Sequence, residues 1–188
     1  MSAMSVSARP VKFTYEDFLD FPDDGRRHEL LDGEHLVTPS PNRSHQHAVV
    51  HLTHLLHGHV RGRDLGRVFT APFDVVLSNH DVLEPDLLFI SRARIEHLTE
   101  ANVQGPPDLV IEILSPGTAR IDLGGKRRAY EKFGVREYWI VDPRKRSVTQ
   151  VEFGTIPGGA ATTHEGGTSF VSALLPGLVV AVAEIFED

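Results

Sequence analysis

Cysteine is absent from the 188-residue chain. Its absence excludes disulfide bridges, thiolate metal ligands and cysteine nucleophiles together, and it is compatible with a reducing compartment. The sequence also lacks any run near the ~18 uncharged apolar residues of a membrane-spanning helix. Residues 1–10 are small and polar, without the apolar core of a secretory signal. We therefore expect a cytoplasmic protein with no membrane partner.

Positive charge is in short supply as well. Lys and Arg number 19 against 26 Asp and Glu, which gives a net charge of −7. A protein that coats nucleic acid through charge alone is basic, so a nucleic-acid role here would rest on a local patch or on bound metal ions. The length allows one domain with a real core, and 40% hydrophobic residues argue against wholesale disorder. We expect a flexible tail over residues 1–12 and a single domain over residues 13–188.

Hydrophobic periodicity and turn residues predict a mixture of helices and strands. Thr14 and Asp17 form a capping-box pattern for a short helix that ends near Pro22. Further helices are predicted over residues 44–60, 92–100 and 123–133 and at the acidic C-terminus. Strands are predicted over residues 28–31, 34–38, 66–70, 73–77, 82–90, 108–114, 137–141 and 148–153, followed by a loop through about residue 168 and a last strand. Hairpins combined with one strand–helix–strand unit indicate an α/β fold, with a mixed sheet flanked by helices.

The predicted helix over residues 44–60, which Ser44 would cap, has two unlike faces. At about 100° per residue, one face gathers Ala48, Val49, Leu52, Leu55, Leu56 and Val60. The opposite face carries His47, His51, His54 and His57. Histidines at i, i+4 and i+7 have a spacing that could hold zinc. No acidic residue accompanies them, so the pattern favours solvated histidines on a polar face.

Two carboxylates stand out because their neighbours are apolar. Asp86 follows Pro85 and precedes the apolar run 87–90, and Glu112 lies inside the run 109–114. The run 109–114 belongs to a predicted strand, and both faces of that strand are apolar. Glu112 therefore has no solvated side unless it lines a cleft. A buried carboxylate is costly unless it is paired, protonated or bound to a cation. A structural ion pair is the simpler alternative to a metal or catalytic role, and the pattern leaves both open.

Lys126 begins the apolar stripe of the helix that follows Glu112. Ala129, Tyr130 and Phe133 continue that stripe at helical spacing. The position suggests a partner in the acidic cluster, although a lysine can also extend its ammonium past a helix end into solvent. The glycine pair just before Lys126 is interpreted as loosening the start of the helix.

These residues carry a resemblance to a known superfamily. Pro85-Asp86, Glu112 in VIEILSP and Lys126 in GGKRRAY resemble the PD-(D/E)XK nuclease signature. More specifically, the chain resembles the Uma-type family of restriction-endonuclease-like proteins from residue 13 onward. The segments that carry this resemblance include TYEDFLDFPDDGRRHELLDGE, EPDLLFISR, PPDLVIEILSPGTAR and KRRAYEKFGVREYWIVDP. It implies a restriction-endonuclease-like core, in which the central strands of a mixed sheet lie between helices.

The resemblance also implies a metal site. Asp86 and Glu112 would share a Mg²⁺ or Mn²⁺ ion, and Glu29 would be a further catalytic acid. By its own pattern, Glu29 is typical of an ordinary exposed glutamate. Carboxylate oxygens suit these two ions, which keep several waters and accept phosphate oxygens.

The implied catalytic lysine departs from the usual signature. That signature has its lysine two residues after the acidic strand residue, where this chain has Leu114, so Lys126 would act as a relocated lysine. It would orient or help to deprotonate the attacking water and offset transition-state charge. His45 with Gln46, which resembles a family motif near the site, and Tyr130 would support the catalytic residues.

The implied activity is that of a metal-dependent endonuclease that hydrolyses DNA phosphodiester bonds, with RNA not excluded as substrate. Cutting two strands suggests a homodimer. A positive rim near the motifs would come from Arg92, Arg94, Arg120, Arg127 and Arg128.

Two other functions stay open at this stage. The chain could be a non-catalytic binding or regulatory module that keeps the nuclease fold, or a metal-dependent hydrolase of another phosphate ester. In each case, acids that converge without a cation repel one another, and burial should raise the pKa of at least one of them.

Overall fold

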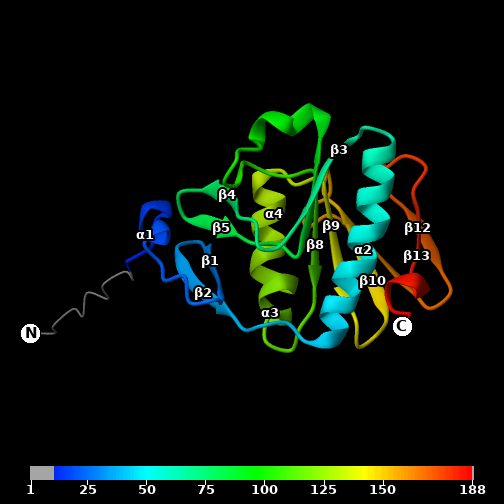
Figure 1. Ribbon diagram of the computed structural model, residues 1–188, viewed down its shortest axis with the longest axis horizontal. Helices are drawn as coiled ribbons and strands as arrows, with labels where there is room; N and C mark the ends of the chain where they lie inside the picture. Colours follow the sequence, from blue (N-terminus) through cyan, green and yellow to red (C-terminus); the bar gives the residue numbers. More distant parts are fainter. Residues whose placement is uncertain (1–10, 188) are drawn as a thin grey trace, which may run out of the picture.

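A six-stranded sheet forms the centre of the computed structural model, which describes residues 11–187 (Figure 1). Its strand order is β11-β10-β9-β8-β6-β3, in which β8 and β9 run parallel and the other neighbours antiparallel. The strands are β3 (Gly66–Thr70), β6 (Leu87–Ser91), β8 (Leu109–Ile113), β9 (Glu137–Asp142), β10 (Ser147–Glu152) and β11 (Ala160–Glu165). The predicted mixed sheet is therefore confirmed.

Helix α2 (Arg43–Gly62) covers one face of this sheet (Figure 1). Its apolar side packs against Leu109, Ile111 and Ile113 of β8, which are fully buried because every second residue of a strand points the same way. Trp139 of β9 belongs to the same cluster and is also fully buried. The prediction that the run around Glu112 is a buried central strand is confirmed.

The connection from β8 to β9 crosses the opposite face. It consists of α3 (Ala119–Ile121), the π-helical turn η2 (Asp122–Lys126) and α4 (Arg127–Phe133). On this side Val110 of β8 packs with Tyr130 of α4. As predicted, the helix ends at Gly134, whose φ of 91° is a left-handed conformation that glycine adopts without strain.

A second, five-stranded sheet has the order β2-β1-β5-β4-β7. Its strands are β1 (Arg27–Leu31), β2 (Glu34–Thr38), β4 (Val75–Ser78), β5 (Asp81–Leu83) and β7 (Val103–Gln104). The predicted hairpin of β1 and β2 turns at Asp32 and Gly33, both with positive φ. Helix α1 (Tyr15–Leu19) packs beside β1 and begins with the predicted capping box of Thr14 and Asp17.

The single strand predicted over residues 82–90 is wrong, and the break matters for the site. β5 ends at Leu83 in the second sheet, and β6 begins at Leu87 in the central sheet. Pro85 lies between them and has no N–H to donate to a ladder, which helps to end the pairing there. Glu84 and Asp86 therefore lie where the chain passes from one sheet to the other.

Three other local predictions need correction. Asn42, and not Ser44, caps α2, because its side chain accepts the N–H of His45. Residues 92–97 form a 3₁₀-helix, η1 (Arg92–His97), within the predicted helical stretch 92–100. The predicted loop through residue 168 contains β11, an edge strand whose side chains are mostly exposed and so lack an apolar alternation.

The C-terminal segment completes the α2 side of the core. β12 (Ser169–Val171) and β13 (Val179–Ala181) form a hairpin, and the 3₁₀-helix η3 (Ala183–Ile185) packs against α2. Residues 1–10 of the predicted tail lie outside the described residues, and Lys12 forms an ion pair with Asp32. In the described part of the chain, no helix has the length and apolar character needed to cross a membrane.

Candidate active site

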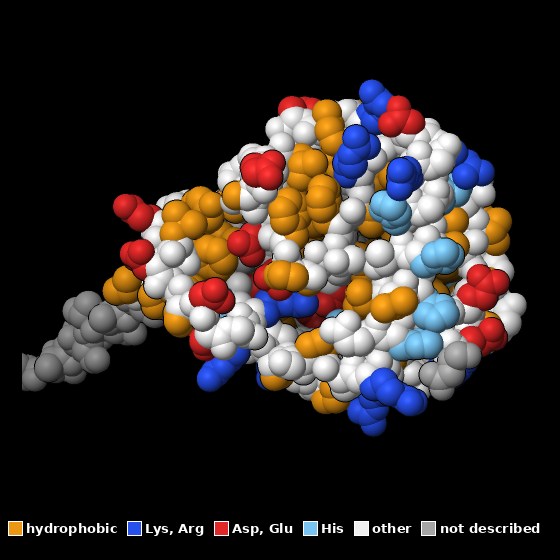
Figure 2. All heavy atoms as spheres, in the orientation of Figure 1, with side chains coloured by type: hydrophobic (Ala, Val, Ile, Leu, Met, Phe, Trp, Pro, Cys, Tyr) orange, Lys and Arg blue, Asp and Glu red, His pale blue; other side chains and the backbone are white. Residues whose placement is uncertain are grey.

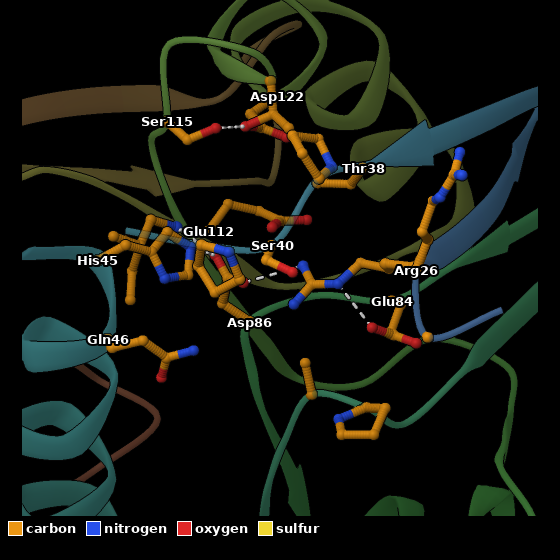
Figure 3. Close-up of a pocket in the computed structure, with 18 of the residues that line it drawn as sticks. Arg26, Thr38, Ser40, His45, Gln46, Glu84, Asp86, Glu112, Ser115 and Asp122 are labelled. Carbon is orange, nitrogen blue, oxygen red and sulfur yellow. Dashed lines mark hydrogen bonds and ion pairs between the residues drawn. The ribbon is translucent and has the colours of Figure 1, made fainter. Parts of the chain in front are cut away.

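A polar pocket of about 370 Å³ opens where the two sheets meet the N-terminal end of α2 (Figure 3). β1 contributes Arg27 to its wall, the β5–β6 link contributes Glu84 and Asp86, and β8 contributes Glu112. The π-helical turn η2 contributes Asp122 and Lys126, and α2 contributes His45 and Gln46. Glu29 of β1 lines an adjoining cavity of about 180 Å³, which shares Asp122 and Lys126 with the first. The structure thus brings the predicted acids and the predicted lysine together.

Lys126 lies at the centre of this cluster, with a side chain only 3% exposed. Its Nζ is 2.8 Å from Glu29 Oε1, 3.0 Å from Glu112 Oε1 and 3.6 Å from Asp122 Oδ1. The alternative in which Lys126 reaches solvent is therefore wrong. Burial alone would lower its pKa, but the surrounding carboxylates outweigh burial and raise the pKa above the usual lysine value. The side chain is consequently an ammonium and a hydrogen-bond donor.

The π-helical turn and the close approach of Gly125 to Leu31 place Lys126 among the carboxylates. A single π turn inserts one extra residue into a helix and is frequent at functional sites. It sets Asp122 and Lys126 four residues apart on the same side. A Cβ atom at Gly125 would lie 2.6 Å from Leu31 Cδ2, so a larger residue there would have to displace the Leu31 side chain of β1. The glycine pair interpreted as loosening the start of the helix lies in this π-helical turn, directly before α4.

Glu112 is a buried acid that shares its cationic partner, Lys126, with two other carboxylates. It is 2% exposed, and its Oε1 accepts hydrogen bonds from Lys126 Nζ and, at 2.8 Å, from Tyr130 Oη. Burial raises the pKa of Glu112 to about 8, because the opposing charge of Lys126 is countered by the nearby carboxylates, Asp122 first among them. Burial likewise raises the pKa of Asp122. The predicted rise in a carboxylate pKa is found at these two residues.

Asp86 lies in the opposite kind of environment. Its Oδ1 accepts a hydrogen bond from Arg27 at 2.9 Å, and its Oδ2 accepts from the Ile113 N–H at 2.8 Å and from His45 Nε2 at 3.1 Å. Burial would raise the pKa of Asp86, but the His45 hydrogen bond and the charges of His45 and Arg27 outweigh burial and lower it. His45 therefore supports Asp86 directly, and its Nδ1 is buried without a hydrogen-bond partner.

Three site residues were missed by the sequence analysis: Arg27, Glu84 and Asp122. Arg27 Nε forms an ion pair with Glu84 at 2.6 Å while its Nη1 holds Asp86. Burial raises the pKa of Glu84 to about 7 against the lowering effect of Arg27. Alternation could have found Arg27, because it lies two residues before Glu29 on one strand, and helical spacing could have found Asp122, four residues before Lys126.

The remaining predicted side chains have varied positions. Gln46 is exposed at the pocket rim (Figure 3). The five arginines of the predicted rim do not line either cavity, and Arg26 and Arg27 supply the positive charge there instead. Arg94, for example, donates to the backbone carbonyls of Pro106, Pro107 and Gly134.

The chemistry of the pocket fits a divalent cation. Glu29, Glu84, Asp86, Glu112 and Asp122 provide five carboxylates, against the permanent positive charges of Arg26, Arg27 and Lys126. Within residues 11–187, no three acidic or histidine side chains are already spaced to hold an ion by themselves, and this includes the histidines of α2. Mg²⁺ is usually bound by one or two carboxylates plus waters and substrate phosphates, so a pair of carboxylates suffices.

Comparison with known proteins places this geometry in a family. The model of the Uma2 family, described as "Putative restriction endonuclease", matches residues 15–183. The chain belongs to the Uma2 family.

Two further similarities accompany the Uma2 match. The chain is 29% identical over 132 residues to uncharacterized protein slr1290 of Synechocystis sp. (strain ATCC 27184 / PCC 6803 / Kazusa), across 69% of this chain and 68% of that protein. Its fold is similar to the crystal structure of a protein from Anabaena variabilis ATCC 29413, described as "a putative nuclease belonging to DUF820". The TM-score is 0.79 at 19% identity, over 93% of this chain and 97% of that chain. The predicted fold class and family are confirmed.

Proposed function

We propose that this Uma2 protein is a Mg²⁺- or Mn²⁺-dependent endonuclease that hydrolyses DNA phosphodiester bonds. One observation carries the proposal: Asp86, Glu112 and Lys126, which come from three separate segments, meet in one pocket, with Lys126 Nζ 3.0 Å from Glu112 Oε1. Membership of a family described as restriction endonucleases supports the same reaction class.

In this proposal Asp86 and Glu112 hold the cation. The ion would supply a more acidic water and neutralise charge on the phosphate. Arg27, His45 and the Ile113 N–H fix the carboxylate of Asp86, and Tyr130 fixes that of Glu112. Side chains held on several sides lose little entropy when a substrate arrives, which favours a preorganised site.

Lys126 serves as a cation rather than a base. Three carboxylates keep it an ammonium, so it orients the attacking water by donating a hydrogen bond and stabilises negative charge on the phosphate oxygens. Its predicted help in deprotonating that water is not supported by this environment. Cutting both strands of a duplex would place two such sites together, so we propose a homodimer, which sedimentation in the presence of DNA would test.

The experiment is hydrolysis of plasmid and linear DNA by purified protein with Mg²⁺ or Mn²⁺ and with EDTA, combined with calorimetric titration of Mn²⁺. We expect metal-dependent cleavage that Asp86→Ala and Glu112→Ala abolish, together with weaker Mn²⁺ binding in both variants. Glu152→Ala, at an exposed position of β10, is the matched control and should behave as wild type. Absence of cleavage and of Mn²⁺ binding in the wild type would overturn the proposal.

A further inference from the structure

Helix α2 has an unusual charge pattern for this acidic protein. Its twenty residues include no Asp or Glu, although the chain carries a net charge of −7. The side of the helix opposite its buried face presents Arg43, His47, His51, His54, His57 and Arg61. We call this set the α2 ridge. Because the ridge carries no carboxylate of its own, it repels a polyanion less than a surface that contains acidic side chains.

The N-terminal end of α2, where the ridge starts, also borders the pocket, although the ridge residues themselves do not line it. His45 and Gln46, at the N-terminal end of α2, line the pocket that holds Asp86 and Glu112. Figure 2 shows a line of histidine side chains over α2, beside the hollow in which recessed charged residues are visible, with Lys and Arg side chains beyond both ends of the line. A ligand that follows the ridge towards its N-terminal end therefore arrives at the candidate catalytic residues.

We propose that the α2 ridge binds the phosphate backbone of a nucleic acid and directs it into the pocket. The inference rests on the proposed nuclease function, and it names the surface that the rest of the substrate contacts. It also gives a role to the histidine row, for which a zinc site fails because no third ligand is placed with the histidines within residues 11–187.

The dimensions and chemistry of the ridge fit a phosphate backbone. From Arg43 to Arg61 the helix rises roughly 27 Å at 1.5 Å per residue, which matches about eight base pairs. A guanidinium binds phosphate oxygens with two parallel hydrogen bonds. An imidazole has an N–H to donate whether neutral or protonated, so histidines can contact phosphates without carrying a full charge. Such contacts position a nucleic acid and do not read its sequence.

The neighbouring elements leave the middle of the ridge open. β3 and η3 pack against α2 and bring Arg67 and Glu184 to its flanks. At the N-terminal end, the His47 ring lies 4.3 Å from the His51 ring at an angle of 39°, and His47 contacts the carbonyl of Glu187. His54 and His57 are exposed in the middle of the helix, which makes them the positions to alter.

The test is binding of a fluorescein-labelled 20-base-pair duplex in EDTA, measured by fluorescence anisotropy over a range of salt concentrations. His54→Glu/His57→Glu adds two negative charges to the ridge. We expect its Kd to rise at least tenfold and the slope of log K against log salt to become shallower by about one or more. The milder variant His54→Gln/His57→Gln/Arg61→Gln should show a smaller loss in the same direction, and melting curves report whether each variant is folded.

The matched control removes two positive charges from exposed positions on the opposite face of the central sheet. Arg128→Gln/Lys132→Gln on α4 changes the net charge by the same amount and should alter Kd less than twofold. Equal losses in the control and ridge variants, or wild-type binding by folded ridge variants, would overturn the ridge as the docking surface. If the wild-type protein cleaves DNA with metal and the ridge variants bind the duplex as tightly as wild type, this inference alone is overturned. If the wild-type protein neither binds nor cleaves nucleic acid, the proposed nuclease function is overturned as well.

Discussion

The two halves of the pocket hold their carboxylates in opposite ways. On one side, Asp86 accepts hydrogen bonds from Arg27, His45 and a backbone N–H, and its pKa is lowered. On the other side, Glu112 shares the single ammonium of Lys126 with two further acids, and its pKa is raised to about 8. The protein compensates the charge of Asp86, whereas the carboxylates around Lys126 keep negative charge in excess.

This difference separates a carboxylate that stabilises the fold from one that is available to bind a cation. A satisfied carboxylate stabilises the fold in the absence of any ligand, and an undercompensated one stores a cost that only a cation or a proton can relieve. Asp86 and Glu112 both line one pocket, so the proposed cation would be held by one preorganised carboxylate and one undercompensated carboxylate. Removing the charge of Asp86 and removing that of Glu112 should therefore change the metal-free stability in opposite directions. Four predictions test the contrast between the two groups, from the largest expected effect to the smallest.

Removal of Arg27 should have the largest effect on stability. Arg27→Ala leaves Glu84 and Asp86 without their cation in a buried site, and breaking a buried pair in this way costs about 3–5 kcal/mol. Its neighbour Arg26, paired only with Asp24 and 65% exposed, offers a matched control whose loss should stay below about 1 kcal/mol. Urea unfolding in EDTA measures both. Similar losses in the free energy of unfolding for Arg26→Ala and Arg27→Ala would show that the buried pairing of Arg27 with Glu84 and Asp86 contributes no more than a surface ion pair.

Lys126→Ala should reduce the proposed nuclease rate by roughly 100-fold or more, because a positioned charge is lost where transition-state charge develops. Mn²⁺ binding should be retained, since the carboxylates remain and their main competitor is gone. Lys132→Ala, an exposed lysine on the same helical connection, is the control for activity. A wild-type rate of DNA cleavage by Lys126→Ala would show that Lys126 only balances the charge of the buried acids and has no catalytic role.

Opposite pH dependence of the two carboxylates is the third expectation. Glu112 has a folded pKa of about 8 against an ordinary 4.5, so the folded state binds the proton more tightly and metal-free stability falls as pH rises between those values. Glu112→Gln should flatten that fall, with a Tm advantage over wild type that grows by roughly 4–10 °C between pH 5 and pH 8. Melting curves in EDTA across this range measure it.

Asp86 should respond in the reverse direction. Its pKa is lowered in the fold, so ionised Asp86 contributes stability above its unfolded pKa that is lost as pH falls through the folded value. Asp86→Asn should therefore melt below wild type at pH 7 in EDTA, although mutual repulsion of the acids alone would suggest the contrary. Parallel pH curves for Asp86→Asn and Glu112→Gln would contradict the division of the pocket.

Much of this arrangement could be predicted because the pattern around each residue is local. Apolar neighbours indicated Glu112 and Asp86 as candidate buried acids, and the helical stripe suggested an acidic partner for Lys126, although a solvent-reaching lysine stayed open. The pairing of Arg27 with Asp86 joins residues 59 positions apart, and no local pattern specifies such a contact. The π-helical turn was also beyond reach, since its register depends on how closely Gly125 packs against Leu31.

The smallest predicted effect concerns Tyr130. It tests whether the hydrogen bond from Tyr130 positions Glu112 as a metal ligand or only contributes to the stability of the core. Tyr130→Phe deletes one of the two donors to Glu112 Oε1 and leaves Lys126 Nζ, while Tyr138→Phe deletes a donor to the backbone carbonyl of Asp122 at 3.1 Å. Both hydroxyls are buried and each loss should cost about 1 kcal/mol, or a Tm fall of about 2–4 °C. Only Tyr130→Phe frees the carboxylate of Glu112, so calorimetric titration should show altered Mn²⁺ affinity, by a fewfold, in that variant alone. Equal Mn²⁺ affinities in the two variants and the wild type would show that Tyr130 supports the core and leaves the ligand position of Glu112 to Lys126.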